Sequence, residues 1–207
     1  MQVTDKTEIE YPATQILHPG SRELFRYWES LRAERACPSR SDLDLHQLVR
    51  ILPDMMILEK NILNTGWQYR LAGTRFCDFF QGELTGKDAL AGWENFERSV
   101  VDKCLEVTMQ RLQPSLVRMR FVSELGNTVA AEMIALPIFS HNLNRVQVIG
   151  GFFPFIAPTR HAVDHLVRRE LVSARMIWTE HEQGDVLLDQ AGRQAPSHLR
   201  VIQGGLR

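Results

Sequence analysis

The sequence predicts an α+β fold in which helices pack on one face of an antiparallel sheet. Three observations support this: after two N-terminal helices there are two strand-like runs, then further helical segments, and finally three more strand-like runs. A hairpin and a meander share one antiparallel sheet, whereas a doubly wound parallel sheet alternates strands with helices. The chain accordingly divides into an irregular leader at 1–20, a domain at 21–158, a C-terminal helix at 159–181 and a flexible tail at 182–207.

Two helices are predicted before the first strand. Ser21 is a suitable N-cap, and apolar residues then recur at helical spacing until Pro38 ends the segment. Asp44 and Gln47 stand three apart, as in a capping box, and open a short second helix that ends at Pro53. These helices flank the predicted sheet on its N-terminal side.

The first two strands are expected to form a hairpin. Residues 55–58 are a short apolar run, and beyond a turn the residues 67–71 alternate between apolar and polar, which is the period of a strand. Short helical pieces follow, and then a longer helix from Trp93 to Leu112, which Pro114 ends. The stripe that this helix is expected to bury steps by three and four residues: Trp93, Phe96, Val100, Cys104 and Val107.

Three strands close the predicted domain, at 117–121, at 128–139 and at 146–155. If the tight connection between the first two is the three residues 125–127, Glu132 lies opposite Arg120. We then expect a cross-strand ion pair that contributes under roughly 1 kcal/mol.

A further helix is predicted after Pro158. Its apolar stripe would contain Val163, Val167, Leu171, Ala174 and Trp178. Three nearby basic residues, Arg168, Arg169 and Arg175, are too few to form a nucleic-acid-binding stripe.

Composition excludes several classes of function. The formal net charge of -1 provides no overall field to attract nucleic acid or an anionic membrane. The N-terminus lacks the apolar segment of a signal peptide, and no apolar run approaches the roughly 18 residues that a spanning helix needs. The three cysteines are widely spaced, which suits free thiols in a reducing cytosol. We therefore expect a cytoplasmic protein.

Four segments carry a family resemblance: LFRYWESLRAERACPSRSDLD at 24–44, ILPDMMILE at 51–59, YRLAGTRFCDFFQGELTGKD at 69–88 and ALPIF at 135–139. Over about residues 21–156 the chain resembles the short single-domain PAS proteins of alphaproteobacteria. The resemblance implies a five-stranded antiparallel sheet in the order 2-1-5-4-3, with helices over one face. It also implies signalling through protein contacts, often as a homodimer. The chain departs from the family at Gln81-Gly82, where the family has Gly-Arg, and so lacks an arginine that could bind an anion there.

The resemblance also implies a ligand between sheet and helices, in a pocket that is mostly apolar with a few polar groups. The side chains expected there are Tyr69, Arg70, Arg75, Phe79, Phe80, Trp93 and Arg118. The alternative is that the aromatic residues belong to the core and the arginines are solvated or paired.

No cofactor is indicated. Residues 93–112 contain no histidine to ligate haem, and the neighbours of Cys77 do not match the flavin-reactive motif of light-sensing relatives. His161 and His165 have a spacing suited to a metal, but no third ligand is evident, so no metal site is predicted.

The first predicted helix carries more apolar surface than one side of a helix needs. We expect a homodimer interface there, made by Leu24, Phe25, Tyr27, Trp28 and Leu31. The alternative is that this helix covers its own sheet.

The sequence thus predicts a stand-alone PAS-type regulatory protein that acts by binding a signalling partner and a small ligand. No nucleophile elbow, P-loop, Rossmann glycine pattern or paired-carboxylate spacing is present, so we do not expect an enzyme. The alternative is a small α+β enzyme acting on a small molecule in the same cavity, which would need a convergent acid, base or nucleophile.

Overall fold

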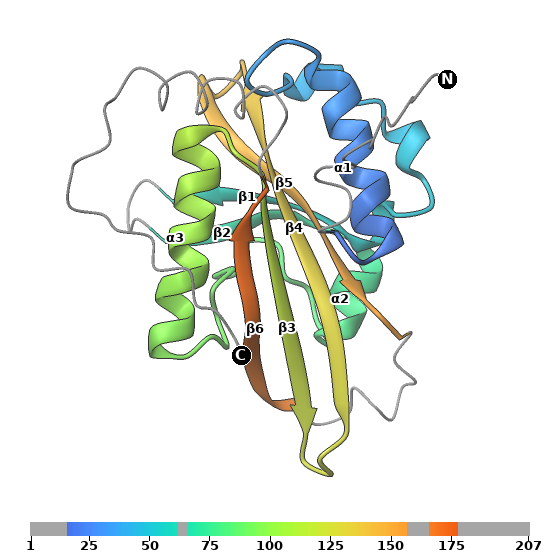
Figure 1. Ribbon diagram of the computed structural model, residues 1–207, viewed down its shortest axis with the longest axis vertical. Coiled ribbons are helices and arrows are strands. Elements are labelled where there is room, and N and C mark those ends of the chain that lie inside the picture. The colour runs from blue at the N-terminus through green and yellow to red at the C-terminus, as the bar shows by residue number, and fades with distance from the viewer. Residues whose placement is uncertain (1–15, 62–65, 157–165, 178–207) are drawn as a thin grey trace, which may run out of the picture. The chain divides into compact units, whose positions relative to one another are not determined.

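A six-stranded antiparallel sheet forms the centre of the protein (Figure 1). The computed structural model describes residues 16–61, 66–156 and 166–177. The strand order is β2-β1-β5-β4-β3-β6, which confirms the predicted order 2-1-5-4-3 and adds a strand at one edge. The strands are β1 (Met55–Lys60), β2 (Trp67–Ala72), β3 (Ser115–Ser123), β4 (Thr128–Ser140), β5 (Arg145–Pro154) and β6 (Leu166–Met176).

Helices lie on both faces of this sheet (Figure 1). Helix α3 (Asn95–Arg111) covers one face together with the short α2 (Thr74–Phe79). The opposite face carries α1 (Pro19–Arg32). Three 3-10 turns, at Arg40–Asp42, Leu45–Leu48 and Leu52–Asp54, connect α1 to β1. The sheet therefore separates an α3-side core from an α1-side core, because alternate strand residues point to opposite faces.

The buried side of α3 differs from the predicted stripe. Val101, Leu105 and Thr108 are buried, whereas Phe96 is 77% exposed. The expected stripe was wrong because the helix has apolar residues on two neighbouring faces, and sequence spacing alone does not choose between them. Trp93 is buried, but it lies before the helix begins.

The prediction of a C-terminal helix at 159–181 is wrong for residues 166–176, because these residues form β6 and pair with β3. The register shifts between Arg118 and Met119, so that one residue of β6 is bulged. As a result Leu171 and Ala174, three apart, both pack against the α3-side core. This spacing resembles that of a helix. The rest of that predicted helix, most of the leader and the tail at 182–207 lie outside the described residues.

The α1-side core contains the residues expected at a dimer interface. Leu24, Phe25, Tyr27 and Trp28 are buried within the chain, and Leu31 packs against them. Trp28 Nε1 donates a hydrogen bond to the Pro137 carbonyl at 2.7 Å. These side chains therefore cover their own sheet, as the alternative hypothesis states, and present little apolar surface to a second copy.

Glu132 in β4 anchors the start of α1 to this face. Its fully buried carboxylate accepts hydrogen bonds from the backbone N–H groups of Leu17, at 3.1 Å, and His18, at 2.9 Å. It also accepts from Arg118 Nε at 2.9 Å. One buried acid thus holds both the chain entering α1 and a neighbouring strand.

The predicted Arg120–Glu132 pair is wrong, because Glu132 faces Arg118. The N–H of Ser123 donates to the Asn127 carbonyl, so the turn is 124–126, one residue earlier than expected. Gly126 occupies a left-handed conformation there, with φ of 78°. Because the turn begins one residue earlier, the β3 residue opposite Glu132 changes by two positions, from Arg120 to Arg118.

His18 makes stability depend on pH. Burial lowers the pKa of its imidazole below the ordinary value of 6.5, and the neutral ring accepts a hydrogen bond from Gly20 N at 3.0 Å. The unfolded chain therefore takes up a proton first as pH falls. We expect the contribution of His18 to the free energy of unfolding to be constant above about pH 6.5 and to decline below it, by at most about 1.4 kcal/mol per pH unit.

Urea denaturation at a series of pH values measures this decline. His18→Gln should lose that part of the pH dependence, whereas the exposed His46 and His141 serve as control positions. Equal pH profiles for the wild type and His18→Gln would contradict the assignment.

Candidate ligand-binding site

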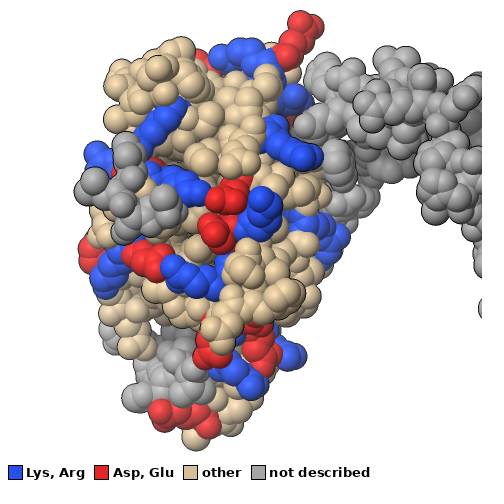
Figure 2. Space-filling view, turned by 90° about the vertical axis from the view of Figure 1, so that its left-hand side faces the viewer, with Lys and Arg blue, Asp and Glu red and all other residues tan. Residues whose placement is uncertain are grey.

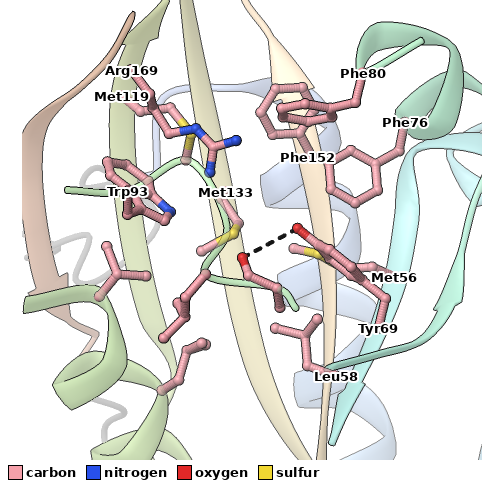
Figure 3. Close-up of a pocket in the computed structure, with 14 residues that line it drawn as sticks. Met56, Leu58, Tyr69, Phe76, Phe80, Trp93, Met119, Met133, Phe152 and Arg169 are labelled. Atoms are coloured by element: carbon pink, nitrogen blue, oxygen red, sulfur yellow. Dashed lines mark hydrogen bonds between the residues drawn. The ribbon is translucent and has the colours of Figure 1, made fainter. Parts of the chain in front are cut away.

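A small cavity lies between the sheet and α3 (Figure 3). Its volume is about 20 Å³, room for roughly one water molecule. Most of its lining is apolar, and Tyr69 and Arg169 bring polar groups to it. The lining side chains are Met56, Leu58, Tyr69, Phe76, Phe80, Ala89, Leu90, Trp93, Val101, Leu105, Met119, Met133, Phe152 and Arg169.

An aromatic cluster forms one wall. Phe79 on α2 packs edge-to-face on Phe152 of β5 and on Phe121 of β3, with ring centroids 4.8 and 4.9 Å apart. Gly73 directly before α2 permits this position, because a Cβ there would lie 2.3 Å from the Pro53 carbonyl oxygen. The close approach of the backbone thus fixes where α2 can place its rings.

Arg169 of β6 projects its guanidinium toward the cavity (Figure 3). The guanidinium carbon lies 4.9 Å from the ring centroid of Trp93, 5.1 Å from that of Phe80 and 5.3 Å from that of Phe121. Arg169 Nε has no hydrogen-bond partner, and no carboxylate of the described residues forms an ion pair with Arg169. Three aromatic rings thus surround a cation that has no anionic partner in the described part of the chain.

Burial is the main electrostatic influence on both polar side chains of the cavity. It lowers the pKa of the Arg169 guanidinium from its ordinary value, and it raises the pKa of the Tyr69 hydroxyl to about 12. Tyr69 is therefore neutral near pH 7, and its hydroxyl donates to the Ala89 carbonyl at 3.4 Å. Each cation–ring contact contributes about 0.5–2 kcal/mol, which offsets part of the cost of removing the guanidinium from water.

The structure brings together only part of the predicted site. Tyr69, Phe80 and Trp93 line the cavity, and Phe79 packs beside them. The three predicted arginines lie elsewhere: Arg70 is exposed, Arg75 Nε donates to Asp54 at 2.9 Å, and Arg118 lies on the α1 side with Glu132. Assigning these arginines to the cavity was wrong. As the alternative hypothesis states, Arg70 is exposed to solvent, and Arg75 and Arg118 are paired with carboxylates.

Sequence reasoning missed Arg169 and the methionines of the cavity. Arg169 was placed on a helix surface, although Arg169 and Leu171 are two residues apart and so share one face of a strand. Met56, Met119 and Met133 come from three different strands, so no local spacing connects them.

The chain matches a known protein family. A family model described as PAS domain matches residues 16–153. The chain belongs to the PAS domain family. No curated protein matches it. PAS domains are generally sensory or regulatory modules rather than catalysts, and the matched range includes α1 to α3 and nearly all of β5 but ends before β6.

On the side of the PAS domain shown in Figure 2, acidic and basic side chains are interspersed over the described surface. No helix in the described ranges is long and apolar enough to cross a membrane. Residues 16–61, 66–156 and 166–177 also hold no cluster of three potential metal ligands. His161 and His165 lie outside these ranges.

Proposed function

We propose that this PAS domain is a regulatory module that binds a small ligand in the cavity between sheet and α3 and acts through protein contacts. The observation that carries the proposal is the cavity itself, which is apolar and aromatic but is also lined by Arg169, a half-buried cation whose Nε has no hydrogen-bond partner among the described residues. Ligand sites in proteins combine an apolar lining with a few polar groups that orient the ligand.

The cavity must enlarge to accept a ligand. Its volume of about 20 Å³ is well below the roughly 150 Å³ of an apolar cavity that holds benzene. Met56, Met119 and Met133 are suited to such enlargement, because methionine side chains are unbranched and adapt to new shapes. Ligand binding then favours a conformation other than the packed one, which is the requirement for a ligand-gated regulator.

Strand β6 is the element that would transmit the change. Arg169 on β6 lines the cavity, and within the described residues β6 pairs with a strand on one side only. A ligand that moves Arg169 would shift an edge strand, which other proteins contact readily. The homodimer implied by the family resemblance stays a prediction, and it needs a surface other than the buried side of α1.

Native mass spectrometry of the protein purified from its own host tests this proposal. We expect a bound small molecule that is released on denaturation, and the same spectra report the oligomer and any partner. Leu105→Phe, which adds a ring to the cavity wall, should lose the bound mass, whereas Phe96→Ala on the exposed side of α3 should keep it. A ligand retained equally by both variants would place the site elsewhere.

A further inference from the structure

Among residues 16–61, 66–156 and 166–177, no carboxylate pairs with Arg169. The carboxylates of Asp88 and Glu97, which face the same side of the sheet, are engaged elsewhere. Asp88 Oδ2 accepts from Arg98 at 2.8 Å, and Glu97 Oε1 accepts from the backbone N–H of Leu171 at 2.9 Å. Tyr69 supplies a neutral hydroxyl and no negative charge. Removing a charge from water costs free energy unless the charge is paired, so this half-buried guanidinium would gain from an anion in the cavity.

The remaining lining restricts what that anion can be attached to. Apart from Tyr69 and Arg169, the cavity offers methionine, leucine, valine, alanine, phenylalanine and tryptophan side chains. Such a surface gains from burying an apolar or aromatic body. One guanidinium balances one negative charge, and a dianion would leave a net charge in an apolar site.

We propose that Arg169 recognises the carboxylate of a small apolar or aromatic acid, which replaces the rings of Phe80, Trp93 and Phe121 as its partner. This inference rests on the proposed function and names the ligand class of that site. The planar guanidinium matches a carboxylate with two parallel hydrogen bonds. Because Arg169 stands on β6, beyond the part of the chain that the family model matches, this recognition belongs to the added strand.

The matched probes phenylacetate and phenylacetamide separate charge from shape. Binding is measured by NMR on the full chain carrying ¹³C-methyl methionine, since Met56, Met119 and Met133 report on the cavity. We expect phenylacetate to bind about tenfold to hundredfold more tightly than the amide, the usual value of a hydrogen bond to a charged group. Phenyl phosphate, a dianion near neutral pH, should bind more weakly than phenylacetate.

Two variants on the same strand complete the test. Arg169→Met should bind acid and amide alike. Arg168→Met should keep the preference for the acid, because Arg168 is 63% exposed and pairs with Glu170 instead. Thermal unfolding of each variant confirms that the fold is retained.

The outcomes separate this inference from the proposed function. Equal binding of acid and amide by the wild type, or a preference that survives in Arg169→Met, would overturn the role of Arg169 while leaving a ligand cavity. Stronger binding of phenyl phosphate would overturn the assignment to a carboxylate. If neither phenylacetate nor its amide perturbs the cavity methionines, the ligand class is wrong, and native mass spectrometry decides the cavity proposal independently.

Discussion

Glu132→Ala is expected to lower the free energy of unfolding by about 3–5 kcal/mol, the usual effect of removing one partner of a buried ion pair. The change leaves Arg118, whose side chain is only 15% exposed, without this carboxylate. It also removes the acceptor for the N–H groups of Leu17 and His18. Chemical denaturation measures the loss, and hydrogen exchange of those two amides should become faster than that of the α1 interior.

Arg120→Met is the matched control for this prediction. Arg120 lies on the same strand two residues beyond Arg118, but its side chain is 52% exposed and pairs with Glu170 at the surface. Solvent screens such a pair, so the control should change stability far less. Equal losses for the two variants, or a loss under about 1 kcal/mol for Glu132→Ala, would mean that Glu132 is not a buried anchor.

The sheet was predictable where burial imposes one pattern. Residues 55–58 form a continuous apolar run because β1 lies between β2 and β5 and is covered on both faces. In β2, Trp67 and Tyr69 alternate with more exposed residues, as expected for a strand near an edge. The order 2-1-5-4-3 came from the family resemblance, since local patterns do not determine which strands become neighbours.

The errors occurred where local spacing was ambiguous. A bulge gives Leu171 and Ala174 the spacing of a helix face, although both belong to a strand. The position of each arginine depends on strand pairing rather than on residue type. Because the turn after β3 comes one residue earlier than expected, Glu132 lies opposite Arg118. Because β6 pairs with β3, Arg169 lies at the cavity. Three of the predicted aromatic residues, Tyr69, Phe80 and Trp93, do line the cavity, whereas its cation, Arg169, was not predicted.

Trp28→Ala is expected to destabilise the protein by about 3–5 kcal/mol, because a fully buried large side chain leaves a cavity that its surroundings fill only in part. Trp28 is 1% exposed, and its indole N–H is the donor to the Pro137 carbonyl of β4. The loss should appear in chemical denaturation as a lower midpoint. Arg26→Ala on the exposed side of the same helix should leave the midpoint nearly unchanged.

Trp28→Phe distinguishes this role from the predicted dimer interface. It keeps an aromatic ring in the α1-side core but removes the hydrogen bond to Pro137, so the variant should fold with reduced stability. Since the Trp28 side chain is buried inside its own chain, light scattering should give the same mass for this variant as for the wild type. A folded Trp28→Phe protein with half the wild-type mass would instead place Trp28 between two copies, and α1 would then have to leave its own sheet to make that contact.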